Sequence, residues 1–522
     1  MTPTWPLAKT SRILTLVGND LTIDIRARKT ASSLARAGFS VISIGIDKTG
    51  LVKNPEFLDG ALLHRVTPPT RSNISSQTFR LSLPQLRDSF YHRSEEHRFL
   101  LQFLRRNLIS TKILHTNRPF FCTAALCRLI TKICQALRIP QRVQQKIISR
   151  VGTRFNKYEG KVAFFPRTFR VLLIQRRFQI TAFTYRVLVR LCQNRRPILK
   201  KSWRSDLPEL ERYDAELGRI VDELKADLIH VHDVFHLGLA IRAKKRAETS
   251  GRTLKVVYDV HEYIPGLPIN PRQRAAYQNL EEEYAPQADA LVTVSPGLSD
   301  FITERFGVSA ELILNAPDLE TAVTTTPLRD IIDLSEDSPL IAYVGGIAPH
   351  RGAGDLVKMI PLLSPNIHLA FIAASSTGYI ATLSDLAESL GVGDRVHIVP
   401  YVAPEAVVSY ISSADVSVIP LSREVENYEI ALPNKLFQSI HAQVPLAVSD
   451  NPDMSKFVAD HKIGEVFSGG DINSMASADT NILDNPLLYA QALKDPTLLN
   501  KTTWSNQSKK LREVYQDLGV TL

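Results

Sequence analysis

Two histidines are each followed directly by an acid at the end of an apolar run: His232 with Asp233, and His261 with Glu262. Such runs are typical of buried parallel strands, and open α/β sheets bind ligands at the carboxyl ends of their strands. An imidazole in that position can move a proton or stabilise charge near neutral pH. A single histidine is more often structural, but two pairs at equivalent strand ends favour a functional role.

A pair of glycines offers a second chemistry. Gly345 and Gly346 end another apolar run, and Arg351 follows shortly before a predicted helix. Glycines let the backbone approach a ligand closely, while the guanidinium and the helix N-terminus both favour negative charge. The turn therefore suits a diphosphate, although a tight turn with a solvated arginine fits the same residues. It lacks the GxGxxG spacing of a dinucleotide site, which argues against a dehydrogenase.

A third candidate is the segment 424–438, which follows an apolar run and opens a helix at about Pro433. Glu426 and Glu429 can accept hydrogen bonds from sugar hydroxyls, and Lys435 can reach a phosphate. The alternative is an acidic surface loop, because clustered glutamates are more often solvated than functional. The candidate donor-binding residues of this segment are Asn427, Glu429, Asn434, Lys435 and Gln438.

Strand and helix patterns alternate in two series, and such alternation is typical of parallel sheets buried on both faces. It predicts two Rossmann-like, doubly wound α/β domains, residues 1–330 and 331–485. A helical tail, 486–522, is expected to close across the cleft between them. The predicted strands are 13–18, 39–46, 62–66, 227–232, 256–261, 290–295 and 312–315, then 340–344, 368–373, 396–400, 416–420 and 446–449.

The net charge of +10 is unevenly distributed, because residues 101–205 hold 24 Lys and Arg and one acid, Glu159. We predict a basic insert in the first domain, at about 75–205. Its clearest amphipathic pattern, 126–139, suits the interface of an anionic membrane. Alternatively, the apolar face packs on the first domain and the charges are solvated. Because no nucleic-acid-binding signature accompanies the charge, we do not expect nucleic acid as a partner.

The compartment follows from segments that the sequence lacks. It contains no apolar run long enough for a spanning helix, and the run near the N-terminus is too short for a signal peptide. We therefore expect a cytoplasmic protein, peripheral on the inner face of the membrane. The four cysteines are expected to be reduced, and they lack the paired spacing of a zinc site: Cys122, Cys127, Cys134 and Cys192.

As a set, four stretches resemble the family-four retaining glycosyltransferases of the GT-B fold: 227–233, 258–262, 344–352 and 432–437. The resemblance implies two Rossmann-like domains that face a central cleft. It further implies sugar transfer from a nucleotide diphosphate with retained anomeric configuration, without a metal ion or another cofactor.

The resemblance also assigns roles to single residues. It implies that His261 lies beside the donor sugar and that Arg351 binds the donor diphosphate. Both are therefore the candidate catalytic residues, and the main catalytic effect expected is stabilisation of the leaving group by fixed positive charge. The loop 427–435 is expected to offer backbone N–H groups to the distal phosphate. Gly345 and Gly346 belong to the same donor site, and the candidates on the acceptor side are His232, Asp233 and Glu262.

Three departures from the family pattern leave more than one function open. Gln438 stands where a Glu commonly binds the ribose hydroxyls, Gln443 where a Gly is common, and Gly346 where many members carry an Arg. The first hypothesis is a transferase that meets a lipid-linked or surface-polysaccharide acceptor at the cytosolic membrane face. The alternative is a catalytically degenerate GT-B scaffold that binds the membrane or partner enzymes. A nucleotide-sugar epimerase would share the cleft but has no use for the basic insert.

Overall fold

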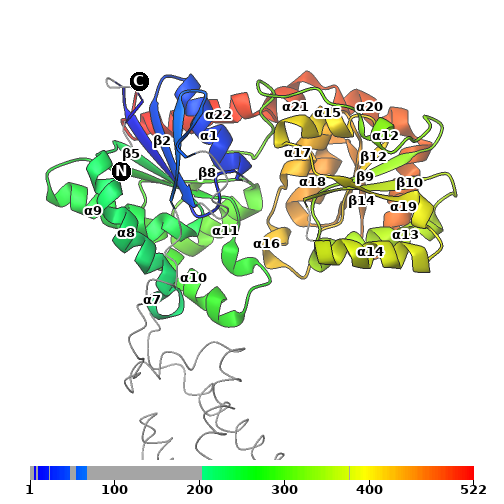
Figure 1. The fold of residues 1–522 in the computed structure, drawn as a ribbon, viewed down its shortest axis with the longest axis horizontal. Helices are drawn as coiled ribbons and strands as arrows, with labels where there is room; N and C mark the ends of the chain where they lie inside the picture. Colours follow the sequence, from blue (N-terminus) through cyan, green and yellow to red (C-terminus); the bar gives the residue numbers. More distant parts are fainter. Residues whose placement is uncertain (1–4, 7–9, 23, 47–53, 67–202, 375–376) are drawn as a thin grey trace, which may run out of the picture. The chain divides into compact units, whose positions relative to one another are not determined.

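The computed structural model describes residues 5–6, 10–22, 24–46, 54–66, 203–374 and 377–522. They belong to one compact unit, drawn in colour in Figure 1. The amphipathic pattern predicted at 126–139 and the four cysteines lie outside the described residues, as does almost all of the predicted basic insert.

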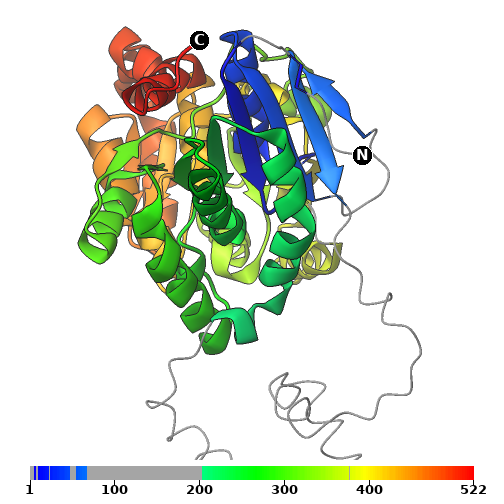
Figure 2. The same ribbon diagram turned by 90° about the vertical axis from the view of Figure 1, so that its left-hand side faces the viewer.

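The first sheet of the described residues has eight strands in the order β3-β4-β2-β1-β5-β6-β7-β8. Its neighbouring strands are parallel except β3 and β4, and Figure 2 shows the blue strands β1, β2 and β4 side by side. Because β1 lies between β2 and β5, the strand order reverses there, and ligands bind at such switch points. The strands are β1 (Arg12–Val17), β2 (Ser40–Ile46), β3 (Glu56–Leu58), β4 (Ala61–Val66), β5 (Leu228–His232), β6 (Lys255–Val260), β7 (Ala290–Thr293) and β8 (Ala310–Leu312).

The second sheet is entirely parallel, with six described strands in the order β11-β10-β9-β12-β13-β14. Its strand order reverses between β9 and β12, so the second domain has its own switch point. The two doubly wound α/β domains predicted from the sequence are therefore confirmed. The strands are β9 (Leu340–Gly346), β10 (His368–Ala374), β11 (Val396–Pro400), β12 (Val416–Ile419), β13 (Leu446–Ser449) and β14 (Gly464–Phe467).

Helices cover both faces of the first sheet, as the alternation of β1 shows. Leu14 and Leu16 pack with residues of α8 to α11, whereas Ile13 and Val17 pack with residues of α1 and α22. Successive side chains of a strand point to opposite faces, so both faces of β1 are buried. The helices of this domain are α1 (Ile25–Arg36), α7 (Trp203–Asp206), α8 (Pro208–Leu224), α9 (Leu237–Thr249), α10 (Pro271–Tyr284), α11 (Pro296–Phe306) and α22 (Trp504–Asp517).

The second sheet is covered in the same way. Ala342 and Val344 of β9 pack with residues of α12 and α15, and Ile341 and Tyr343 pack with residues of α13, α14 and α17 to α21. The helices are α12 (Leu328–Ile331), α13 (Ala353–Met359), α14 (Thr377–Ser389), α15 (Val407–Ile411), α16 (Glu426–Glu429), α17 (Asn434–His441), α18 (Pro452–His461), α19 (Ile472–Asp484), α20 (Pro486–Leu493) and α21 (Pro496–Lys501).

The end of the chain returns to the first domain. Figure 1 shows α22, in red, beside α1. Trp504 and Tyr515 of α22 are fully buried in the cluster that contains Ile13 and Val17. Trp504 Nε1 donates a hydrogen bond to the carbonyl of Lys29, at 3.1 Å. The predicted tail therefore divides, because residues of α20 and α21 pack in the core of the second domain and α22 packs on the first.

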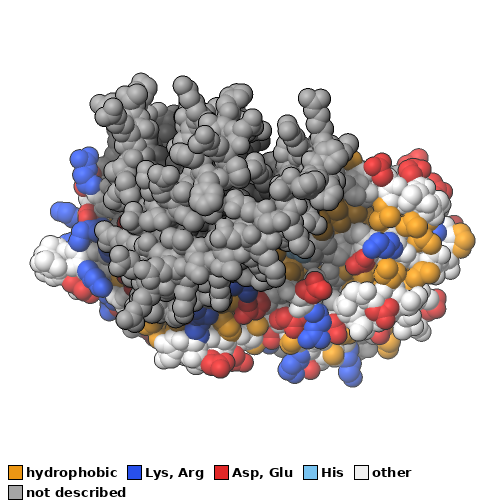
Figure 3. All heavy atoms as spheres, turned by 90° about the horizontal axis from the view of Figure 1, so that it is seen from below, with side chains coloured by type: hydrophobic (Ala, Val, Ile, Leu, Met, Phe, Trp, Pro, Cys, Tyr) orange, Lys and Arg blue, Asp and Glu red, His pale blue; other side chains and the backbone are white. Residues whose placement is uncertain are grey.

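Among the described helices, none is long and apolar enough to cross a membrane. On the face shown in Figure 3, the described Lys and Arg side chains are interspersed with Asp and Glu. The excess of positive charge in the sequence is concentrated instead at 101–205.

Candidate functional site

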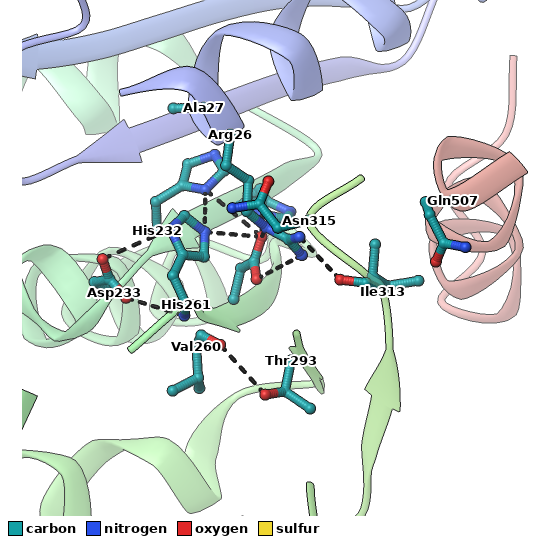
Figure 4. A network of polar contacts seen from close by, with 12 residues as sticks. Arg26, Ala27, His232, Asp233, Val260, His261, Thr293, Ile313, Asn315 and Gln507 are labelled. Atoms are coloured by element: carbon teal, nitrogen blue, oxygen red, sulfur yellow. Dashed lines mark hydrogen bonds and ion pairs between the residues drawn. The ribbon is translucent and has the colours of Figure 1, made fainter. Parts of the chain in front are cut away.

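The two histidine–acid pairs lie side by side because their strands are parallel neighbours. The register of β5 and β6 pairs His232 with Asp259, so the residues that follow each strand meet at one edge of the sheet. His232 Nδ1 lies 2.9 Å from His261 Nε2, and Figure 4 shows both rings with Asp233 beside them. The structure thus brings together three of the residues selected from the sequence.

The centre of this cluster is Asp259, a residue that the sequence did not single out. Its carboxylate accepts two hydrogen bonds from Arg26 of α1, at 2.8 and 3.0 Å. Asp259 Oδ2 also lies 3.0 Å from His230 Nε2 and 3.1 Å from His261 Nε2. Arg26, His230 and Asp259 are all buried, so the cluster carries its own counter-charges.

Opposing charges set the protonation of the cluster. Burial lowers the pKa of His261, but the carboxylates of Asp259 and Asp233 outweigh it and raise that pKa to about 9. Burial would raise the pKa of Asp259, yet Arg26 and His261 hold it well below its usual value. Burial also keeps the pKa of His232 well below the usual range. At neutral pH, His261 is therefore a cation and His232 is neutral.

The His261 cation is more exposed than the neighbouring histidine of the cluster. The side chain of His261 is 10% exposed, whereas that of His232 is 1% exposed. An imidazolium between two carboxylates is poorly suited to accept a proton, and well suited to donate a hydrogen bond to an oxygen that gains negative charge. His261 can therefore stabilise charge at this edge, while His232 contacts other protein groups.

Asp233 holds the turn on which His261 and Glu262 lie. Its Oδ1 accepts hydrogen bonds from the backbone N–H groups of His261, at 3.0 Å, and Glu262, at 3.3 Å. Burial raises the pKa of Asp233 to about 7, although the charge of His261 opposes this. Asp233 also has a φ of +56°, a conformation that costs a non-glycine residue energy and is enriched at functional sites.

His230, His232 and Asp259 place three potential metal ligands within 4.8 Å of one another. The donor set does not suit a metal ion, however. Both oxygens of Asp259 already accept hydrogen bonds from the Arg26 guanidinium, and a cation held there would lie beside that fixed positive charge. The contacts instead describe a hydrogen-bond network centred on the Asp259 carboxylate, at whose border His232 Nε2 has no hydrogen-bond partner among the described residues.

In the second domain, two cations lie over the two-glycine turn at the end of β9. Gly345 has a φ of +119°, and a Cβ there would lie 3.8 Å from Lys435 Nζ. A Cβ on Gly346 would lie 3.3 Å from Arg351 Nη1. Arg351 follows β9 in a short 3₁₀ turn, and Lys435 lies in the first turn of α17 after β12. The switch point of the second sheet therefore brings both cations to one turn.

The positive charge at this turn is not compensated within the described residues. Lys435 Nζ is buried without a hydrogen-bond partner and lies 4.2 Å from the centroid of the Tyr343 ring. Burial, helped by the nearby Arg351, lowers the pKa of Lys435 to about 7. No acid among the described residues contributes to the pKa of Lys435. A buried ammonium without a partner is costly, and an anion at this turn would remove that cost.

The remaining donor-binding candidates divide into two groups. Asn427 Oδ1 accepts a hydrogen bond from Tyr263 N at 2.7 Å, and Glu429 accepts two from Arg423, each at 3.0 Å. Both side chains are therefore held by protein groups. Asn434 is partly buried at the start of α17, and Gln438 is buried one turn later.

Contacts between the two domains bring the histidine turn close to the cationic turn. Tyr263, two residues after His261, is hydrogen-bonded to Asn427, which precedes Tyr428. The Tyr428 ring stacks on His350, with centroids 6.1 Å apart. Burial raises the pKa of Tyr428, and Arg351 opposes this. His261 and Arg351 thus lie on the two sides of one short path of contacts.

Comparisons with protein families found two matches. The family model described as glycosyl transferases group 1 matches residues 325–495, and the model described as glycosyltransferase family 4 matches residues 167–321. Together the two matches span more than half of the chain. No curated protein matches the sequence significantly.

Solved structures show the same fold. Sucrose-phosphate synthase from Thermosynechococcus elongatus matches over 98% of this chain and 99% of its own, with a TM-score of 0.59 and 14% identity. A glycosyltransferase from Rickettsia africae matches over 99% of this chain and 100% of its own, with a TM-score of 0.58 and 9% identity. The two family matches and this shared fold show that the chain belongs to the family-four glycosyltransferases of the GT-B type.

Proposed function

We propose that this glycosyltransferase moves a sugar from a nucleotide diphosphate to a lipid-linked or surface-polysaccharide acceptor at the cytosolic membrane face. We further propose that the anomeric configuration is retained and that no metal ion takes part. The observation that carries the donor half of this proposal is the uncompensated charge of Lys435 and Arg351 at the Gly345 turn. A diphosphate supplies the negative charge that these side chains lack.

The cations would act on the leaving group. When the bond between the sugar carbon and the diphosphate oxygen breaks, negative charge grows on the diphosphate. Arg351 and Lys435, with the backbone N–H groups at the start of α17, are positioned to stabilise that charge. A divalent cation performs the same task in other transferases, so fixed side-chain charge would replace it here.

The acceptor would attack from the face that the diphosphate leaves. In that step the acceptor oxygen bonds to the sugar carbon, the carbon–diphosphate bond breaks, and the acceptor proton passes to a diphosphate oxygen. His261 would donate a hydrogen bond to the donor sugar, which agrees with its raised pKa. Asp233 would hold the backbone of that histidine through the hydrogen bond to its N–H.

The basic stretch supports the proposed acceptor side. Residues 101–205 carry 24 Lys and Arg against one acid, and each basic residue near an anionic membrane contributes about 1 kcal/mol to binding. A lipid-linked acceptor would be met at such a surface. The test is flotation of the full chain with phosphatidylglycerol vesicles and with neutral ones. Binding to the anionic vesicles that is lost in high salt supports the proposal, whereas equal recovery with both contradicts it.

A thermal-shift experiment tests the donor site. The full chain is heated with UDP, GDP or ADP, alongside Lys435→Met, Arg351→Ala and the control Lys358→Ala, a cation paired with Asp355 on α13. At a hundredfold excess over its Kd, a nucleotide stabilises the fold by about 2.7 kcal/mol. We expect one nucleotide to stabilise the wild type and the control but neither site variant. No shift with any nucleotide, or full shifts in both site variants, contradicts the proposal.

Turnover distinguishes an enzyme from a scaffold. With the sugar donor of the nucleotide that binds, the configuration of the released sugar or product is read by NMR, in the presence and absence of EDTA. We expect retained configuration and unchanged activity with EDTA. A protein that binds nucleotide and vesicles but never consumes a donor would be the degenerate scaffold, to which Gln438 points.

A further inference from the structure

The last helix contributes a polar atom to the buried network behind His261. Tyr515 of α22 lies with its hydroxyl 2.7 Å from His230 Nδ1, and both side chains are fully buried. The two residues are 285 positions apart in sequence. Tyr515 is therefore brought to the first sheet only by the return of the chain end.

The direction of each hydrogen bond follows from the carboxylate. Burial lowers the pKa of His230, so its imidazole is neutral and carries one proton. Asp259 is ionised and only accepts hydrogen bonds, so the proton of His230 lies on Nε2, which faces Asp259 Oδ2 at 3.0 Å. His230 Nδ1 is then an acceptor, and the Tyr515 hydroxyl is its donor.

These bonds continue to the functional histidine. Asp259 Oδ2 lies 3.1 Å from His261 Nε2, so one oxygen accepts from His230 on one side and from His261 on the other. Asp259 sets the tautomer of His230, the hydroxyl holds the His230 ring in place through Nδ1, and His230 supports the oxygen that holds His261. We propose that Tyr515 is a positioning residue for His261, acting through His230 and Asp259. The catalytic consequence rests on the proposed function, in which His261 contacts the donor sugar.

Packing alone does not require the hydroxyl. The Tyr515 ring makes an edge contact with Phe39, with centroids 6.5 Å apart, and lies in an apolar cluster with Ile13 and Leu511. A phenylalanine would keep these contacts. The hydroxyl itself would otherwise be a buried polar group, and such groups are kept where they have a partner.

Other charged groups around the two histidines come from several elements. They act on the same protons and remain unchanged in a Tyr515→Phe variant. They are Arg26 and Lys29 from α1, His232 at the end of β5, Asp233 after it, and Asp259 and Glu262 before and after His261.

The first test compares Tyr515→Phe with Val514→Ala, a neighbour on α22 that packs in the same cluster. We expect Tyr515→Phe to lower kcat roughly tenfold while leaving the donor KM unchanged, because an interaction that matters only in the transition state is weakened. Val514→Ala should lower the melting temperature and leave kcat as in the wild type. If both variants change kcat equally, or neither changes it, the proposal is wrong.

A double-mutant test of Tyr515 and His230 provides a second check of the proposal. In a His230→Leu background, Tyr515 has no imidazole to orient, so Tyr515→Phe should cause no further loss of kcat. A tenfold loss that persists in this background would show that Tyr515 acts by another route.

A third measurement needs no turnover. Histidine-labelled full-length protein is titrated by NMR, and each imidazole reports its own midpoint and tautomer. In the wild type, His230 should show the proton on Nε2. In Tyr515→Phe, Asp259 is less firmly held, so the His261 midpoint should fall by about half a pH unit. Unchanged His230 and His261 signals would overturn the proposal even if the chain proves inactive, whereas a shift without any transferase activity would count only against the proposed function.

Discussion

The carboxyl edges of the two sheets both carry cationic side chains, but only in the first sheet are those cations paired with carboxylates of the described residues. Around Asp259, the cations Arg26 and His261 are paired with carboxylates inside the same domain. Around Gly345, the cations Lys435 and Arg351 face each other without a described acid. In the first edge the cations are paired with carboxylates of the protein, whereas in the proposed function the cations of the second edge are paired with a bound diphosphate.

This contrast separates two tasks. A preformed network holds His261 in one geometry before any substrate arrives, so no reorganisation is needed when charge develops. Burying positive charge without a counter-charge raises the free energy of the unbound protein. A bound anion removes this cost and a neutral sugar does not, so the site should prefer anions. In the proposed function, affinity for the donor diphosphate is therefore generated in the second domain, and the first domain sets the geometry of the reacting sugar.

The largest expected effect comes from removing the charge of Asp259, which pairs with Arg26 at the edge of the first sheet. Asp259→Asn keeps the shape of the side chain but leaves Arg26 buried without a counter-charge. Removing one partner of a buried ion pair should lower the free energy of unfolding by about 3–5 kcal/mol. Urea denaturation measures this, with Asp222→Asn as the control, since Asp222 pairs with Arg246 at the surface. If the free energy of unfolding falls by similar amounts in the two variants, the buried network around Asp259 contributes no more to stability than a surface ion pair.

At the edge around Gly345, removing a charge should raise the free energy of unfolding instead of lowering it. Lys435→Met takes away a buried ammonium that has no hydrogen-bond partner and places an apolar side chain beside the Tyr343 ring, over which the ammonium lies. The free energy of unfolding without ligand should rise by about 1–3 kcal/mol. Lys358→Met, an exposed control, should leave stability nearly unchanged. A clear destabilisation by Lys435→Met would mean that this lysine is already satisfied in the free protein.

The pH dependence of nucleotide binding sharpens the same point. The pKa of Lys435 is about 7 in the free protein, and a bound diphosphate would raise it, so binding takes up a proton above pH 7. Affinity should then fall by up to about tenfold per pH unit as the pH rises. Lys435→Arg keeps its charge and should lose this dependence. Calorimetry between pH 7.5 and 9 decides it, and identical profiles for the two proteins would remove Lys435 from the site.

The same lysine sets a pH dependence of stability without ligand. Its pKa is lower in the folded chain than in the unfolded one, so unfolding takes up a proton between pH 7 and the usual lysine pKa. The contribution of Lys435 to stability therefore increases as the pH rises through this window. Lys435→Met should flatten that part of the profile relative to the wild type, which urea denaturation at a series of pH values can show.

The smallest expected effect comes from relieving backbone strain at Gln443, a change that removes no charge. Gln443 follows α17 with a φ of +58°, where many relatives of this family are expected to carry glycine. Gln443→Gly should raise the free energy of unfolding by up to about 1 kcal/mol. The control Ala442→Gly lies at a φ of −76° and should lower it. An equal loss in both would show that the positive φ carries no strain, and neither change should affect nucleotide binding.

Most strands of the two sheets could be predicted, because buried parallel strands leave uninterrupted apolar runs. The short strand β3 was not predicted, and β8 lies at 310–312 instead of 312–315. Two further exceptions have physical reasons. β14 begins with Gly464 and Glu465, which interrupt the apolar pattern. β7 ends before the predicted boundary because Ser295 caps α11 through a hydrogen bond to Leu298 N.

The candidate site could be predicted only in part. Chain order and strand periodicity place His232 beside His261, since both follow neighbouring parallel strands. A charged residue inside an apolar run was a usable signal for Asp259. Arg26 and Tyr515 carried no such signal, because their partners are 233 and 285 positions away and only the tertiary fold brings them together. Whether the donor-binding candidates contact a nucleotide stays a prediction.

The packing of α22 on the first sheet also determines when the core of the first domain can be completed during synthesis on the ribosome. The buried core residues of the second domain come from one stretch of the chain, from Leu314 to α21. On one face of the first sheet, the core cluster that begins at Ile13 also includes Trp504 and Tyr515, so this cluster is complete only after α22 has been synthesised. During synthesis from the N-terminus, the contact of Tyr515 with His230 therefore becomes available only after the core residues of the second domain have been made.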